Sequence, residues 1–576
     1  MVANTKKTCR KMTQPTAEPV KKKPASAKAM AAMKKKEKTN TPMRRHTCKA
    51  DLSDMETYVL KVMAALVKNG RKEVVDRIKS VCKAFKDAGG LYKASGCTGS
   101  NVALPSSLAF FKALRISVPV YDLFSAEGVG FKQDWIKMMC KECGMGEHCV
   151  FDKVEHLRHD EAHCIVHGGH CPVPSVSSPM SQRPFIYEEG FSCKLFSNLF
   201  NGRDDLNGWS REELSAALLE DRVGSTGVTF GAMLDFGWRC RPEFILWENV
   251  EEALKPEQID IIIKCFAKID FACAAGLRNS HDYDNVENRS RAWGVAQNSL
   301  SMGKTWASTL DNVNKIMNSV KQMETGGATL ETRLLPASHK YISALRVHMA
   351  ETAEGREEND IDGWHQKHRQ YAWSHAGIRA SQLNDFSSQH RANPFFSSLP
   401  LRDQQIIRVK SHMNPRACCI ELSQNIDRSA TMSGRLSCLL PSGKQWIRLS
   451  GKNPDWATSK DPKPTEERIL TGAETCMIQG IPKCIVDKAV EMGFSNHKLQ
   501  DLGANAFDGR VYVAHLAAIF SVIDPDYVRE FYETEGLGRA VYEDIQDADG
   551  ATMAASPSAR VRSLPRQASD ATLHFL

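Results

Sequence analysis

The feature that most constrains the fold is a series of short apolar runs between residues 105 and 300. Each run ends in a glycine or an acidic turn, and helical stretches separate the runs. Short buried strands that alternate with helices are typical of a parallel sheet joined by crossover helices. The sequence therefore predicts an α/β fold with a doubly wound, mostly parallel sheet. The runs are ISVPVYDLF, HCIVHGG, EFILWENV and RAWGVA.

Composition and periodicity divide the rest of the chain. Residues 1–50 hold 15 Lys or Arg against 2 Asp or Glu, while the whole chain has a net charge of +8. We expect this stretch to be a disordered basic tail that binds nucleic acid or acts as a nuclear address; a merely solubilising tail is the alternative. The other predicted parts are a helical extension opened by a Ser53–Glu56 capping box (51–104), the sheet core (105–300), a mixed domain (301–460), a helical return to the core (461–535) and a disordered tail (536–576).

Membrane and secreted proteins are disfavoured. No apolar run approaches the length of a membrane span, and no apolar segment behind a charged start indicates a secretory signal. The 18 cysteines are therefore expected to be reduced thiols. Cys140 and Cys143, together with His148 or Cys149, have the spacing of an incomplete zinc site. Loose thiols are the favoured interpretation, so no metal is expected.

Several runs end in turns that can carry chemistry, and in a parallel sheet such turns converge on one site. Cys171, in GGHCPVPSVS, follows a glycine turn as a nucleophile would; a metal ligand or an inert thiol stays open. Glu248 ends a buried strand, where a partly desolvated carboxylate suits a group that shares a proton. The alternative is a helix cap or a salt-bridged carboxylate. Phe124 and Gly128 belong to a turn that lets a cofactor approach the backbone. Asp152 suits an amino group or a ribose.

The order of these pieces resembles the cytosine-5 DNA methyltransferase family. The pieces are DLF with a glycine, an acidic strand end, G-x-C-P, ENV and the pair Arg289 and Arg291. Further on, RILTGAETCMIQGIP and DLGANAFDG resemble the closing segments of that family. The resemblance covers roughly residues 115 to 525. It implies a class I S-adenosylmethionine-dependent methyltransferase fold with a second, smaller target-recognition domain.

The resemblance also implies a mechanism and a cofactor. Cys171 would add to C6 of a flipped-out cytosine, and Glu248 would contact N3 and the exocyclic amine. Arg291, supported by Arg289, would hold the O2 carbonyl. S-adenosyl-L-methionine would donate the methyl group to C5. The residues expected to line its pocket are Phe124, Ser125, Gly128, Asp152 and Asn505.

Duplex DNA in the nucleus is the implied substrate, RNA is a weaker expectation, and the sequence does not indicate an oligomeric state. Three departures from the family pattern affect this reading. His170 and Pro172 flank the cysteine where the family has Pro and Gln, Val129 replaces a glycine, and Glu287 replaces a glutamine. They keep two alternatives open: a catalytically weak relative that binds DNA as a regulatory protein, and an RNA cytosine-5 methyltransferase.

Overall fold

The computed structural model describes residues 48–146, 148–176, 183–194, 196, 224–300, 306–321, 330–353, 363–450 and 464–533. The predicted C-terminal tail, and the predicted N-terminal tail up to residue 47, lie outside the described residues. Within the described part, no single helix is long and apolar enough to cross a membrane; the bent pair Asn496–Val522 and Pro525–Tyr532 passes that test only jointly.

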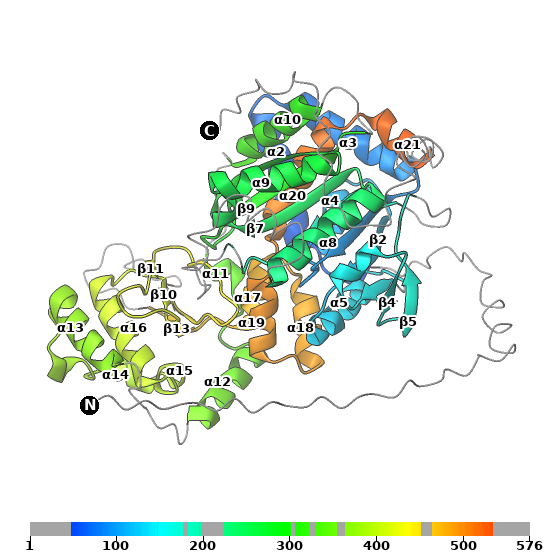
Figure 1. Ribbon diagram of the computed structural model, residues 1–576. Coiled ribbons are helices and arrows are strands. Elements are labelled where there is room, and N and C mark those ends of the chain that lie inside the picture. Colours follow the sequence, from blue (N-terminus) through cyan, green and yellow to red (C-terminus); the bar gives the residue numbers. More distant parts are fainter. Residues whose placement is uncertain are drawn as a thin grey trace, which may run out of the picture. The chain divides into compact units, whose positions relative to one another are not determined.

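A nine-stranded sheet organises the larger part of the chain (Figure 1). Its strand order is β5-β4-β3-β2-β1-β6-β7-β9-β8. The five strands from β3 to β7 in that order run parallel, and antiparallel strands extend the sheet at both ends. The strands are β1 (Leu91–Gly96), β2 (Val120–Ala126), β3 (Cys149–Phe151), β4 (Glu161–Cys164), β5 (Gly169–Pro172), β6 (Ile186–Glu189), β7 (Phe244–Val250), β8 (Phe271–Asn279) and β9 (Ser290–Asn298).

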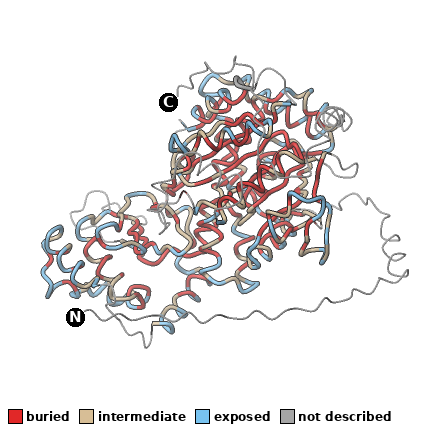
Figure 2. Tube along the Cα trace, in the orientation of Figure 1, coloured by how far each residue is buried: buried red, intermediate tan, exposed pale blue. Residues whose placement is uncertain are grey.

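Helices cover both faces of this sheet, so its strands are the most buried part of the molecule (Figure 2). Along β7, Phe244 and Leu246 pack into one core cluster, and Ile245 and Trp247 pack into the other. This alternation is the period of two that a strand imposes on its side chains. The covering helices include α2 (Ser53–Lys68), α3 (Lys72–Asp87), α4 (Ala103–Ala113), α5 (Gly130–Glu142), α8 (Gly224–Cys240), α9 (Pro256–Lys268), α10 (Trp306–Lys321), α20 (Gly509–Val522) and α21 (Pro525–Glu533).

The predicted helical hairpin at the start of the chain is present as α2 and α3, but the predicted capping box is wrong. Leu52 is the N-cap of α2 and makes no side-chain cap bond. The sheet also begins before the predicted boundary at residue 105. Its central strand, β1, starts at Leu91. The apolar-run criterion missed β1 because Lys93 lies in its middle. This ammonium is fully buried and lies 2.8 Å from the carboxylate of Glu188 on the neighbouring β6.

The helical stretch after β7 is short. It begins at Pro256, ends at Lys268, and gives way to β8, which contains Gly276. Asp270, in the left-handed conformation (φ 57°), turns the chain between the two elements. The segment FACAAGLRN is small and apolar without helical spacing of large residues, and pairing with β9 decides that it is a strand.

The predicted second, smaller domain is also present. It combines a four-stranded sheet of order β11-β10-β12-β13 with helices α12 (Lys340–Ala353), α13 (Trp364–Ala376) and α16 (Leu401–Met413). Its strands are β10 (Cys419–Glu421), β11 (Thr431–Met432), β12 (Gln445–Leu449) and β13 (Glu466–Ile469). After β13 the chain returns to helices α17 (Gly472–Ile478), α18 (Lys483–Glu491) and α19 (Asn496–Ala504). The α/β class with a doubly wound, mostly parallel sheet and a smaller domain is therefore confirmed.

Candidate active site

The carboxyl end of β7 brings Glu248 together with both predicted arginines. β9 runs antiparallel to β7, and Arg291 lies opposite Val250 in the register. Arg291 Nε is 3.2 Å from Glu248 Oε1, and a guanidinium nitrogen of Arg289 is 3.6 Å from the same oxygen. These side chains are largely buried, with Glu248 12% and Arg291 18% exposed. A carboxylate and a guanidinium at one partly dry strand end can hold a planar polar ring from two sides.

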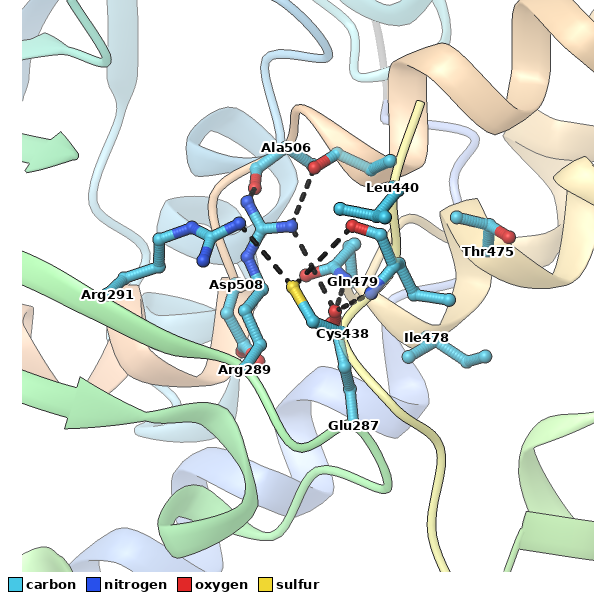
Figure 3. Close-up of polar contacts among 12 residues, drawn as sticks. Glu287, Arg289, Arg291, Cys438, Leu440, Thr475, Ile478, Gln479, Ala506 and Asp508 are labelled. Carbon is cyan, nitrogen blue, oxygen red and sulfur yellow. Dashed lines mark hydrogen bonds and ion pairs between the residues drawn. The ribbon is translucent and has the colours of Figure 1, made fainter. Parts of the chain in front are cut away.

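Arg289 also anchors this strand end to the rest of the chain (Figure 3). Its guanidinium donates to the backbone carbonyls of Ala504 and Ala506 at 2.6 and 3.1 Å. Glu287, two residues earlier, accepts the backbone N–H of Leu439 at 2.7 Å and a side-chain N–H of Gln479. Burial raises the pKa of the Glu287 carboxyl, and Arg289 opposes that shift. The junction therefore ties β9 to the smaller domain and to the turn after α19.

Cys171, the predicted nucleophile, does not belong to this site. It lies on β5, the outermost strand at the opposite edge of the sheet, and six strand spacings separate β5 from β7. At about 4.8 Å per spacing this is roughly 29 Å, too far for one pyrimidine to touch both Cys171 and Glu248. The sequence-based choice is wrong because the run HCIVHGG is not a parallel strand with a catalytic turn. It is the hairpin of β4 and β5.

The cysteine that does lie at the site is Cys193, which follows β6. β6 is the parallel neighbour of β7, so both strands end at the same edge of the sheet. Asn249 Nδ2 donates to the carbonyl of Phe191 at 2.9 Å and joins the two strand ends. Burial and then the Glu248 charge raise the pKa of the Cys193 thiol, while Arg291 and Arg289 lower it. The charges of all three predicted site residues therefore act on the Cys193 thiol.

A pattern in the sequence could have found Cys193. The buried residues Phe185 to Glu189 precede Gly190 and then Cys193, which is the same strand, glycine and cysteine order that favoured Cys171. The apolar-run criterion missed β6 because Glu188 and Glu189 interrupt its apolar residues. In the structure both carboxylates are buried. Ser192 and Lys194 occupy the places where the family has Pro and Gln.

The predicted cofactor turn follows β2, which is not the central strand of the sheet. Because β1 is the central strand, the glycine-bearing turn at the middle of the sheet edge is Gly96 to Asn101, between β1 and α4. Phe124, predicted to line the pocket, packs in the core against Phe151 and Phe236. Ser125 is buried next to Ser95. Neither side chain is available for a ligand.

Glu127 is the functional candidate that the sequence reading missed in this region. It follows β2 and accepts the backbone N–H groups of Gly99 at 2.9 Å and Val129 at 3.0 Å. Gly99 has φ +56°, a left-handed conformation that favours glycine. Gly128 lies in the following turn, where a Cβ atom would meet only the carbonyl of Asp152 at 3.8 Å. An acidic residue at the end of the second strand is what the sequence reading could not find.

Asp152 and Asn505 lie beside the same edge. Asp152 directly follows β3, and its Oδ2 is 3.0 Å from Nδ1 of His163. Its Oδ1 is buried and has no hydrogen-bond partner among the described residues. Asn505 caps the C-terminus of α19, and its carbonyl lies 3.8 Å from the position that a Cβ of Gly99 would take. The edge thus offers a carboxylate oxygen that accepts no hydrogen bond within the described part and lies 3.7 Å from Nδ1 of His156, a glycine turn and a closing loop.

Little empty space remains in the turn itself. A cavity of about 20 Å³ lies between Gly96, Asn101, Glu188 and Phe507. Glu189 fills the space beside Gly96, since a Cβ atom there would lie 2.4 Å from the carboxylate. Burial raises the pKa of Glu189 to about 8, so this carboxyl is largely protonated at neutral pH.

Known proteins support the predicted family. Residues 230–494 match the family model described as C-5 cytosine-specific DNA methylase, a range that includes Glu248, Arg289 and Arg291 but neither Cys171 nor Cys193. A DNA (cytosine-5-)-methyltransferase of Verticillium dahliae is 22% identical over 445 residues, which make up 66% of this chain but only 17% of that relative.

Two solved structures are similar over most of the chain. The S. pombe Dnmt2 methyltransferase has a TM-score of 0.37 and 12% identity, covering 74% of this chain and 98% of its own. The Entamoeba histolytica methyltransferase EhMeth has a TM-score of 0.36 and 10% identity, covering 75% and 98%. The family match and the motif order, not these distant structures, carry the assignment. Residues 230–494 therefore carry a segment of the C-5 cytosine-specific DNA methylase family.

Proposed function

We propose that this chain is an S-adenosylmethionine-dependent DNA cytosine-5 methyltransferase with Cys193 as its nucleophile. The observation that carries the proposal is that Cys193 follows β6, whose parallel neighbour β7 carries Glu248 near its carboxyl end, and that Glu248 is paired with Arg291 of β9. A thiol, a carboxylate and a guanidinium around one partly buried point are the groups that a cytosine ring needs for C5 substitution.

In this mechanism Cys193 adds through Sγ to C6 of cytosine while its thiol proton passes by way of Glu248 to N3, and electron density moves onto C5. Glu248 contacts N3 and the exocyclic amine, so the negative charge of the adduct is neutralised by a shared proton. Arg291, held at 3.2 Å from Glu248, is placed to donate to the O2 carbonyl. After the methyl group has joined C5, the C5 proton leaves to solvent, the Sγ–C6 bond breaks, and Cys193 is restored. The target base must leave the duplex to enter such a site.

The residues around the β1–α4 turn fit the proposed cofactor in their chemistry. Bound S-adenosylmethionine would supply the methyl group as a sulfonium. The Oδ1 atom of Asp152, which accepts no hydrogen bond among the described residues, suits an amino group, and Glu127 at the end of β2 suits ribose hydroxyls. The turn at Gly96 and Gly99 lets the backbone come close to a ligand. The cavity of about 20 Å³ requires the surrounding side chains to move on binding.

A catalytically weak relative that binds DNA is the second candidate. The small cavity and the buried Glu189 beside Gly96 favour it, because both oppose binding of a large cofactor. A covalent-trapping experiment separates the candidates. The full chain is incubated with labelled S-adenosylmethionine and with duplex DNA or RNA that carries 5-fluorocytosine, which blocks the final elimination.

We expect a labelled covalent adduct with DNA that disappears in Cys193→Ala. Cys484→Ala is the matched control, because Cys484 is exposed on α18 and should leave the adduct unchanged. An adduct that persists in Cys193→Ala overturns the choice of nucleophile. DNA binding without adduct or cofactor binding supports the weak relative, and an adduct formed only with RNA changes the substrate.

A further inference from the structure

A second chemical cluster lies at the far edge of the sheet, where Cys171 was found. Cys149 begins β3, Cys164 ends β4, His167 lies in the turn after it, and Cys171 is on β5. The Sγ atoms of Cys149, Cys164 and Cys171 lie 3.7, 3.3 and 3.3 Å from Nδ1 of His167. All four of these atoms lie within 4.8 Å of one another.

We propose that Cys149, Cys164, His167 and Cys171 bind one zinc ion. In a tetrahedral site with Zn–S near 2.3 Å and Zn–N near 2.0 Å, neighbouring ligand atoms are about 3.6 to 3.8 Å apart. The distances to His167 match this spacing with only small adjustment. Three thiolates and one imidazole form a closed set that favours zinc over harder cations. A closed set leaves no position for a substrate, so the metal has a structural role.

The local architecture explains why this edge needs a metal. β3, β4 and β5 have only 3, 4 and 4 residues, and β3 is joined to β4 through a single pair, Phe151 with Cys164. So short an antiparallel edge has little stability of its own. Gly168 (φ +63°) lets the chain turn back after His167, which brings Cys171 beside Cys164. A metal that joins all three strands would add a cross-link to the packing of Phe151 and Ala162 in the core.

The site is coupled to Asp152, and this step rests on the proposed function. His163 lies between Ala162 and Cys164 on β4, and its ring nitrogen is 3.0 Å from Asp152 Oδ2. The backbone N–H of Asp152 also donates to the carbonyl of His163 at 3.2 Å. Zinc that fixes β4 would therefore position Asp152 for the cofactor, although no zinc ligand touches the cofactor.

A neighbouring group of side chains provides a matched control. Asp122, Cys140 and His148 also offer three ligand atoms close together. All three are buried, Asn101 already donates to both Asp122 and Cys140, and the charge of buried Lys93 acts on this group. A buried cation beside Lys93 is unfavourable. The proposed zinc site departs from the expectation of no metal, and of the thiols considered in the sequence analysis it includes only Cys149.

Metal analysis of the full chain tests the proposal. After dialysis against metal-free buffer under reducing conditions, we expect about one zinc per chain. Cys171→Ser and Cys149→Ser should lower the zinc content by about tenfold or more, and Cys140→Ala should not. Cobalt substitution of the wild-type chain should give thiolate charge-transfer bands and the intense bands of tetrahedral cobalt, which keeps the test valid if a serine variant misfolds.

Two results would overturn the proposal. One is a wild-type chain without zinc that takes up no cobalt, whether its thiols are free or two of them are joined in a disulfide. The other is zinc that persists in Cys171→Ser but is lost in Cys140→Ala. Neither measurement involves methyl transfer, so a failed trapping experiment with intact zinc binding refutes the proposed function alone. If both proposals hold, zinc removal should weaken cofactor affinity more than the rate of adduct formation at saturating cofactor.

Discussion

Replacing Glu287 would show whether the junction between β9 and the smaller domain needs a negative charge or only a hydrogen-bond acceptor. Glu287 is fully buried and accepts from the backbone of Leu439 and the side chain of Gln479. Arg289 lies 4.0 Å away and keeps Glu248 and two backbone carbonyls as other partners. The two requirements predict different outcomes for Glu287→Gln and Glu287→Leu.

The structure allows the magnitudes to be worked out. Burial raises the pKa of Glu287, so its ionised form is held at a net cost and a neutral amide avoids that cost. In Glu287→Gln the new oxygen can accept from Leu439, and once the Gln479 amide has turned over, the new NH₂ can donate to Gln479 Oε1, which is buried and has no hydrogen-bond partner in the described part of the chain. We expect a change within about 1 kcal/mol. Glu287→Leu leaves two buried donors unpaired, at about 1–3 kcal/mol each.

Urea unfolding followed by circular dichroism and tryptophan fluorescence measures both variants; Trp446 is buried in the smaller domain and reports on it directly. The expected order is wild type and Glu287→Gln nearly equal, with Glu287→Leu about 2–6 kcal/mol less stable. If the glutamine variant loses as much as the leucine variant, the charge on Glu287 is what holds Arg289, and the reasoning from the acceptor is wrong.

Glu248→Gln should slow covalent trapping by about 10²- to 10⁴-fold, because it removes the shared proton, yet change stability by less than about 1.5 kcal/mol; equal damage to folding and trapping would contradict a chemical role. Burial raises the pKa of Glu189 from 4.5 to about 8, so the folded state prefers the neutral carboxyl. The protonated Glu189 carboxyl therefore adds to the free energy of unfolding in full below pH 4.5, and this contribution is lost as the pH rises to about 8. The loss is on the order of 5 kcal/mol. Glu189→Gln should flatten this dependence in urea unfolding from pH 5 to 8, and an unchanged slope would exclude Glu189 as its source.

Local patterns in the sequence predicted much of the fold correctly. The strands at VYDLF, EFILWENV and RAWGVA, the helical hairpin near the start and the smaller domain are all present. Glu248, Arg289 and Arg291 were found because β7 and β9 are clear strands whose polar ends stand out from apolar neighbours. Each of these conclusions depends on a pattern within about ten residues, which periodicity can detect.

The missed parts of the site depend on pairing between distant segments. Lys93 and Glu188 look like surface residues in their own strands, and only the contact between β1 and β6 makes their burial possible. Without those two strands, the sequence analysis placed the cofactor turn after β2 and selected Cys171 rather than Cys193. The sequence by itself indicated the family resemblance, the α/β class and the polar end of β7. Only the tertiary structure showed that Cys193 follows the strand next to β7 and that Cys171 lies with Cys149, Cys164 and His167 at the opposite edge, because strand order is set by long-range pairing rather than by any local pattern.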